Sequence, residues 1–115
     1  MDDCIFCKII KGEIPSKKVF EDKDIVAFND INPKAPVHVL VVPKKHIESL
    51  ANVDAANKDL LGKLLIAVSE IARKTNVDKS GYKVVANNGE GAGQLVLHLH
   101  FHILGGWMSK PHWQV

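Results

Sequence analysis

Three histidines alternate with apolar residues in one stretch near the end of the chain, which reads His98-Leu99-His100-Phe101-His102-Ile103-Leu104. A period of two is typical of a half-buried β-strand, because successive side chains of a strand point to opposite faces. We therefore expect a strand over 98–104. Its apolar residues would pack on a core, and its three histidines would share the other face.

This row of imidazoles favours chemistry over packing. Histidine contributes little apolar area, and its ring nitrogens need partners when they are buried. Neutral imidazole is also a nucleophile, a proton carrier and a metal ligand near neutral pH. The outer pair would lie roughly 13 Å apart at the backbone, which is too far to share one metal ion. We expect the three histidines to have different roles. The alternative is that they only form hydrogen bonds with their neighbours.

The remaining pattern predicts one α+β domain over 1–115. A short helix is expected over 5–11 and a long helix over 58–75, with Asp54 as its N-cap and Asn76 as its end. Further strands are expected over 19–21, 25–28, 37–42 and 82–87. The order favours an antiparallel sheet with the helices on one side. The buried stripe of the long helix is expected to contain Leu61, Leu64, Leu65, Val68, Ile71 and Ala72.

Charge and composition exclude several classes of function. The chain has 115 residues, 46% of them hydrophobic, and a net charge of only +2, which is well short of a dedicated nucleic-acid binder. No apolar run approaches the length of a membrane span. The first residues lack the layout of a signal peptide, so we expect a cytoplasmic protein.

A Cys-x-x-Cys pair opens the chain at Cys4 and Cys7. Its spacing is that of a zinc knuckle, but two thiolates need two further ligands. A thioredoxin-type redox pair is disfavoured, because no βαβ-style strand precedes it. The alternative is a pair of buried, unliganded thiols.

A loop with three glycines, Gly89, Gly91 and Gly93, precedes the histidines. It matches neither the dinucleotide fingerprint nor the P-loop, both of which lead into a helix. Free backbone N–H groups in such a loop can cradle an anion, although a plain turn has the same composition.

Several blocks, taken together with the three histidines, resemble the histidine triad (HIT) family. They are 5–10 with Glu13-Ile14-Pro15, 28–33 with 35–38, 41–46, Gly93-Gln94 and Leu104-Gly105-Gly106. The resemblance covers essentially the whole chain and is to the Hint branch. It implies a HIT-like fold, with a five-stranded antiparallel sheet, one long helix and one short helix. It also implies a homodimer that pairs two sheets into ten strands.

The resemblance implies roles for the histidines and the loop. His100 is similar to a nucleophile that attacks an α-phosphorus and forms a histidine–AMP intermediate. His102 would contact the phosphate, and His38 would complete the polar cluster. Gly93 and Gln94 would donate hydrogen bonds to phosphate oxygens.

The resemblance also implies a purine nucleotide site. Asp30 would accept hydrogen bonds from the ribose hydroxyls, whereas without the motif it reads as a turn aspartate. The apolar residues of the base slot are equally good core candidates. Leu95 stands where Hint relatives often carry a hydroxyl group, so we expect weaker phosphoramidate turnover. The other residues implied are Phe6, Ile9, Phe28, Asn29, Ile31 and Asn87.

Related proteins bind zinc through positions that match Cys4, Cys7, His46 and His98. This implies one structural zinc ion per chain. Trp113 is similar to a tail tryptophan that reaches the partner subunit, but it lies two residues later here.

The implied function is a hydrolase that releases AMP, or another purine nucleoside monophosphate, from phosphoramidate or adenylylated conjugates. The alternatives are a dinucleoside polyphosphate hydrolase of the Fhit branch and a mainly non-catalytic nucleotide-binding adaptor.

Overall fold

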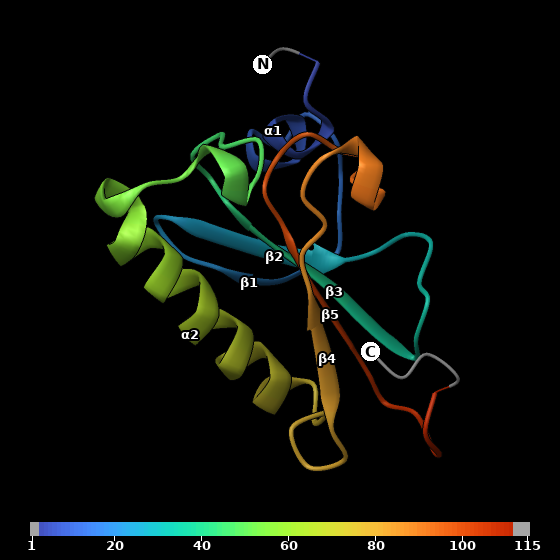
Figure 1. Cartoon of the computed structure of the whole chain (residues 1–115). Coiled ribbons are helices and arrows are strands. Elements are labelled where there is room, and N and C mark those ends of the chain that lie inside the picture. Colours follow the sequence, from blue (N-terminus) through green and yellow to red (C-terminus); the bar gives the residue numbers. More distant parts are fainter. Residues whose placement is uncertain (1–2, 112–115) are drawn as a thin grey trace.

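A five-stranded antiparallel sheet in the order β1-β2-β3-β5-β4 forms the centre of the computed structural model, which describes residues 3–111 (Figure 1). The α+β prediction with this sheet is confirmed. The strands are β1 (Lys18–Glu21), β2 (Ile25–Asn29), β3 (Val37–Pro43), β4 (Tyr82–Val85) and β5 (Phe101–Gly105). The helices are α1 (Ile5–Ile10) and α2 (Lys58–Lys74), and short 3₁₀ turns cover η1 (Leu50–Asn52), η2 (Ala55–Asn57) and η3 (Glu90–Ala92).

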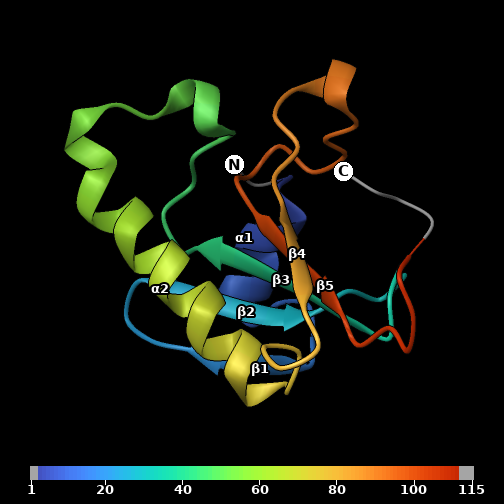
Figure 2. The ribbon, with the colours of Figure 1, turned by 60° about the horizontal axis from the view of Figure 1, so that its bottom comes forward.

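The two helices cover opposite faces of the sheet, as the two views in Figures 1 and 2 show. The expectation that both lie on one side is wrong. Strands β2 and β3 are buried along nearly their whole length, so both of their faces need an apolar cover. One face packs against α2 through Ile25, Ala27, Val39 and Val41. The other packs against Phe6 and Ile9 of α1 through Val26, Phe28, Leu40 and Val42.

Helix α2 buries a slightly different stripe from the predicted one. Leu64, Val68, Ile71 and Ala72 are buried as expected, and Leu61 packs partly buried against the core. Leu65 is 54% exposed, so its predicted burial is wrong. A helix turns about 100° per residue, so an arc centred on Leu64 and Ile71 leaves Leu65 at its edge. Ala67 completes the arc on the other side.

The ends of α2 differ in how well they were predicted. Asp54 caps the 3₁₀ turn η2 rather than α2 itself, because its carboxylate accepts the N–H of Ala56 at 2.9 Å. That turn leads directly into α2. Asn76 ends the helix as predicted, with a left-handed φ of 63° that asparagine tolerates better than most residues. Among the described residues, no helix is long and apolar enough to cross a membrane.

The histidine stretch alternates as predicted, although regular strand pairing begins only at Phe101. Just before it, the N–H of Leu99 donates to the carbonyl of Ile47 at 2.6 Å. Leu99, Phe101 and Ile103 all lie in the core beneath α2. The period of two therefore turns the three histidines toward the α1 face of the sheet.

Candidate functional site

Four potential metal ligands meet beside α1: Cys4, Cys7, His46 and His98, whose ligand atoms all lie within 4.8 Å of one another. Cys4 is the N-cap of α1, and Cys7 lies one turn further on. His46 follows β3, and His98 precedes β5. Three elements that are distant in sequence thus converge on one point.

The distances within this Cys/His cluster suit a tetrahedral metal ion. Cys4 Sγ lies 3.3 Å from Nδ1 of His98, and Cys7 Sγ lies 3.4 Å from Nδ1 of His46 and 3.7 Å from Nδ1 of His98. With Zn–S near 2.3 Å and Zn–N near 2.0 Å, the sulfur–nitrogen edge of a tetrahedron is about 3.5 Å. The cluster can therefore hold one metal ion.

The protonation of His98 also fits a metal ligand. Its Nε2 lies 2.8 Å from the carbonyl oxygen of Pro43. A carbonyl oxygen can only accept, so Nε2 carries the hydrogen and Nδ1 presents its lone pair to the two thiols. A ligand histidine held by a backbone carbonyl in this way is common around metal ions. His98 is completely buried, and burial lowers its pKa, so the ring is neutral at pH 7.

The backbone carbonyl of His98 orients the ring of His100. Its Nδ1 lies 2.6 Å from the carbonyl oxygen of His98 and must donate to it, which leaves the lone pair on Nε2. The ring of Phe6 packs edge-on against His100, with centroids 5.0 Å apart. Burial lowers the pKa of His100, so the ring is neutral near pH 7. A neutral imidazole with a free Nε2 lone pair can act as a nucleophile.

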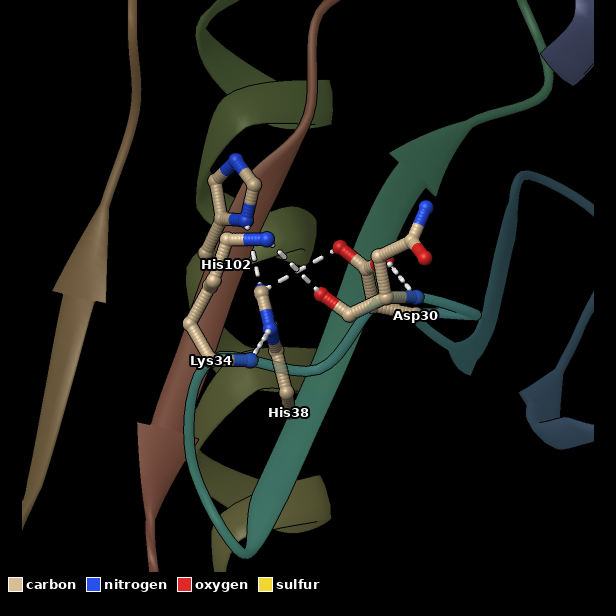
Figure 3. Close-up of polar contacts among 5 residues, drawn as sticks. Asp30, Lys34, His38 and His102 are labelled. Atoms are coloured by element: carbon tan, nitrogen blue, oxygen red, sulfur yellow. Dashed lines mark hydrogen bonds and ion pairs between the residues drawn. The ribbon is translucent and has the colours of Figure 1, made fainter.

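A second polar group joins His38, His102 and Asp30 (Figure 3). Nε2 of His38 lies 2.8 Å from Nδ1 of His102 and 3.4 Å from a carboxylate oxygen of Asp30. The other carboxylate oxygen of Asp30 accepts the N–H of Asn32 at 2.8 Å. The backbone N–H of Lys34 donates to Nδ1 of His38 at 3.0 Å. The register of β3 and β5, which places His38 opposite Leu104 and Leu40 opposite His102, brings the two rings together.

Burial dominates the electrostatics of this second group. It lowers the pKa of His102 to about 4, and the neighbouring His100 and His38 rings add to the shift. The pKa of His38 is also lowered by burial, although the carboxylate of Asp30 opposes the shift. Both rings are therefore neutral at pH 7.

The side chain of Gln94 forms hydrogen bonds within the protein. Its side-chain nitrogen donates to the carbonyls of Glu48 at 2.6 Å and Val96 at 3.0 Å, while its oxygen accepts the N–H of Gly89 at 2.7 Å. The backbone N–H groups of Gly93 and Gln94 also donate within the loop. These donors are committed inside the protein. Gln94 therefore holds the glycine loop in this structure, and its contact with a phosphate stays a prediction.

The residues expected to form the base slot separate into two groups. Phe6, Ile9 and Phe28 lie together in the apolar cluster between α1 and the sheet, and each is less than a tenth exposed. Ile31 projects from the loop after β2 and is 89% exposed. Asn29 is exposed at the end of β2, directly before Asp30.

The last two predicted residues lie around the glycine loop. Asn87 is half-buried just after β4, whereas Leu95 is 93% exposed. Beyond the other end of the histidine row, a hollow of about 520 Å³ is lined by Lys34, Leu104 and the segment 106–111. Trp113 lies outside the described residues.

Sequence reasoning missed the groups that orient the histidines. They are the carbonyls of Pro43 and His98 and the backbone N–H of Lys34. No residue pattern marks them, because every residue type except proline offers the same backbone donor and acceptor.

Comparisons with known proteins agree with this geometry. The HIT domain family matches residues 11–108. Protein HitA of Neisseria gonorrhoeae is 50% identical over 105 residues, which cover 91% of this chain and 97% of that protein. The crystal structure of a HIT family hydrolase from Legionella pneumophila has a TM-score of 0.90 at 46% identity, covering 95% of this chain and 98% of that one.

A third relative is the crystal structure of a histidine triad nucleotide-binding protein from Candida albicans. It is 38% identical, with a TM-score of 0.81, over 98% of this chain and 86% of that one. A family match over most of the chain, together with relatives of this identity, leaves one conclusion: the chain belongs to the HIT domain family.

Proposed function

We propose that this protein is a nucleotide-binding hydrolase that releases AMP, or another purine nucleoside monophosphate, from phosphoramidate or adenylylated conjugates. The observation that carries the proposal is the hydrogen bond from Nδ1 of His100 to the carbonyl of His98 at 2.6 Å. It leaves Nε2 as the only ring atom of His100 with a lone pair. Similarity to a hydrolase and to a nucleotide-binding protein supports the substrate class.

The reaction would proceed in two displacements at the α-phosphorus. In the first, Nε2 of His100 bonds to phosphorus while the bond from phosphorus to the leaving amine breaks, and the amine nitrogen takes one proton from water or from a neighbouring N–H group as it departs. In the second, a water oxygen bonds to phosphorus while the bond to Nε2 breaks, and the proton of the water is released. Because the ring keeps its Nδ1 hydrogen throughout, it becomes cationic in the intermediate and is a good leaving group.

The proposed nucleotide lies along the α1 face of the sheet. His102 would contact the phosphate, and half-buried Asn87 would assist from the glycine loop. Asp30 has one carboxylate oxygen beside His38. Its carboxylate would accept hydrogen bonds from the ribose hydroxyls. The base would lie near Asn29 and Ile31, against the apolar cluster that holds Phe6, Ile9 and Phe28.

We propose that the Cys/His cluster binds one zinc ion and that this ion is structural. Two thiols and two imidazoles are a donor set that zinc prefers, and four protein ligands leave no open position for substrate. When bound, the ion would supply a fixed link between α1 and the residues before β5. The cluster's own residues orient His100 through the backbone of His98.

We also propose that the chain forms a homodimer. Leu65 and Ile66 on α2 are 54% and 62% exposed, and Val84 on the edge strand β4 is 42% exposed. An edge strand of a sheet can pair with a strand of another chain, and a contiguous patch of exposed apolar side chains marks an interaction surface. Light scattering should give a dimer mass for the wild type and a monomer mass for Leu65→Glu, while Lys79→Glu on the exposed surface should remain dimeric. A monomeric wild type would contradict this proposal.

The decisive experiment is mass spectrometry of the intact protein after brief incubation with an adenosine phosphoramidate. We expect an added mass of one AMP moiety in the wild type, and none in His100→Ala or after incubation with AMP alone. Release of AMP by His100→Ala at the wild-type rate would contradict the proposal. Nucleotide binding without turnover would instead indicate an adaptor, and faster turnover of a dinucleoside polyphosphate would indicate the Fhit-type activity.

A further inference from the structure

Cys4 and Cys7 are the only two cysteines of the chain, and their side chains converge. Cys4 Sγ lies 3.3 Å and Cys7 Sγ lies 3.7 Å from the same atom, Nδ1 of His98. Cys4 Sγ also accepts the backbone N–H of Cys7 at 3.4 Å. Two cysteines whose side chains converge can be joined by a disulfide, whereas two that point apart cannot.

The backbone around the two cysteines permits this bond. Cys4 is the N-cap of α1 and has extended backbone angles, with φ −75° and ψ 116°, so it lies just outside the helix. The two sulfur atoms lie within 4.8 Å of each other, and the sulfur atoms of a disulfide are about 2.05 Å apart. The side chain of Cys4 can close this gap by turning toward Cys7, and α1 does not have to unwind.

Both thiols are also within reach of a small oxidant. Cys4 and Cys7 are free and partly exposed, whereas His98 is completely buried. An accessible thiol with a second thiol beside it is typical of sites that are oxidised reversibly. The second thiol captures the oxidised sulfur as a disulfide before it reaches an irreversible oxidation state.

We propose that Cys4 and Cys7 form an oxidation site, at which a hydroperoxide such as hydrogen peroxide produces an intramolecular disulfide. In the first step, one sulfur bonds to a peroxide oxygen while the O–O bond breaks, which gives a sulfenic acid and one water. In the second step, the other sulfur bonds to the first while the S–O bond breaks, and a second water leaves. The two sulfurs together lose two electrons, which the peroxide gains, and the two thiol hydrogens leave in the waters.

The disulfide is incompatible with a metal ion in the Cys/His cluster. A metal ion binds the thiolate form of cysteine, and a disulfide has no thiolate. Oxidation would remove two of the four ligands, so a bound zinc ion would leave, and two protons from the solvent would complete the waters. The release of metal rests on the proposed zinc ion. The disulfide itself rests on neither the zinc ion nor the proposed hydrolase.

Two backbone contacts connect the cluster with the candidate nucleophile. The carbonyl of His98 accepts a hydrogen bond from Nδ1 of His100 at 2.6 Å. The carbonyl of Ile47, next to His46, accepts the N–H of Leu99 at 2.6 Å. Loss of the metal would release both ligand histidines, so the ring of His100 would be held less firmly. Oxidation should therefore lower turnover, a consequence that rests on the proposed function.

The first test uses metal-free protein and counts thiols by alkylation with N-ethylmaleimide and mass spectrometry. Both cysteines should react before oxidation. After treatment with hydrogen peroxide neither should react, and the peptide that contains both should have lost two hydrogens. Dithiothreitol should restore both thiols. Oxidation of Met1 or of the fully exposed Met108 adds an oxygen instead, so fragment masses distinguish the two reactions.

Cys7→Ser is the matched control for the disulfide. It keeps Cys4 without its partner, so peroxide should give a sulfenic acid or a disulfide between two chains, and no bond within one chain. Lys8→Ser, which changes the next residue of α1, should behave like the wild type. If the metal-free chain does not stay folded, the metal-loaded protein provides the same mass measurement.

Two outcomes of this test would overturn the inference. One is that the wild type keeps both thiols under conditions that oxidise Cys4 in Cys7→Ser. The other is that the main products are sulfinic acids or disulfides between chains.

The second test uses zinc-loaded protein and measures released zinc with a coloured chelator. We expect one zinc ion to be released for each disulfide formed. Turnover of an adenosine phosphoramidate should fall in proportion, and dithiothreitol with added zinc should restore it. Zinc that stays bound beside the disulfide would overturn the metal release, and full turnover by the oxidised protein would overturn the effect on His100.

The same measurements separate this inference from the proposals on which its consequences rest. A wild type that binds no zinc would contradict the proposed zinc ion, and one that shows no turnover would contradict the proposed hydrolase. In either case the thiol count alone decides whether Cys4 and Cys7 form an oxidation site.

Discussion

The carbonyl oxygen of His98 accepts a hydrogen bond from Nδ1 of His100 at 2.6 Å. One residue therefore serves two neighbouring sites, since its ring lies in the Cys/His cluster and its backbone orients His100. Phe6 of α1 packs against both rings, 5.8 Å from His98 and 5.0 Å from His100. A substitution or metal loss at the Cys/His cluster should therefore alter the orientation of His100, the candidate nucleophile.

Removal of the metal is the most direct consequence. We expect one zinc ion per chain by elemental analysis, and its loss in Cys4→Ser, because a closed site needs all four ligands. The unfolding temperature should fall by at least about 5 °C, since metal binding stabilises only the folded state. Lys8→Ser, in the same helix but outside the cluster, should keep the metal. A metal-free protein with the stability of the metal-loaded one would contradict this prediction.

Leu95 offers a test of catalytic strength. Its side chain is 93% exposed, so Leu95→Ser should change stability by less than about 0.5 kcal/mol. A hydroxyl at this position could donate to a phosphate oxygen or to the leaving atom, which leucine cannot do. We expect a higher kcat on an adenosine phosphoramidate for Leu95→Ser than for the wild type or Leu95→Ala. An unchanged rate would remove the argument that leucine limits turnover.

Gln94 should prove structural rather than substrate-binding. Gln94→Ala would leave the carbonyls of Glu48 and Val96 without their donor and the N–H of Gly89 without its acceptor. Each buried polar group left without a partner costs about 1–3 kcal/mol. Urea denaturation should show a loss of at least this size. Gln94→Glu keeps an acceptor for Gly89 but turns a carboxylate oxygen toward the two carbonyls, so it should be destabilised as well. A stable Gln94→Ala with weakened nucleotide binding would favour a substrate contact.

Stability should fall as the pH is lowered from about 6.5 to about 4. Burial lowers the pKa of His102 from 6.5 to about 4 in the folded chain. Between these values the unfolded chain binds more protons than the folded one, so acid favours unfolding. At 1.36 kcal/mol per pKa unit the full shift would correspond to roughly 3 kcal/mol, but His102 is only partly buried, so solvent screening makes the loss from this residue smaller than that.

The measurement for this prediction is urea denaturation across that pH range in the presence of a chelator, so that metal release does not contribute. His102→Gln should show a shallower dependence than the wild type. Because the pKa values of His38 and His100 are also lowered, part of the pH dependence of stability should remain in His102→Gln. Equal slopes for the wild type and His102→Gln would show that His102 is not the group responsible.

The elements and the shared face of the histidines follow from local sequence patterns. Alternation with a period of two places His98, His100 and His102 on one side of an extended chain, whether or not regular pairing has begun. The apolar stripe of α2 and the Cys-x-x-Cys spacing are local patterns of the same kind. Local geometry is enough to read them, which explains why the elements were predicted to within a few residues.

How the sheet is covered and which groups each histidine contacts depend on long-range packing. The two-sided burial of β2 and β3 put the helices on opposite faces, and the edge of the α2 arc left Leu65 exposed. The state of each ring depends on the backbone group that packing brings to it: the carbonyl of Pro43, the carbonyl of His98 or the N–H of Lys34. Nearly all residues carry the same backbone N–H and C=O groups, so the residue type does not show which of these groups an imidazole will contact. The fold selects the contact.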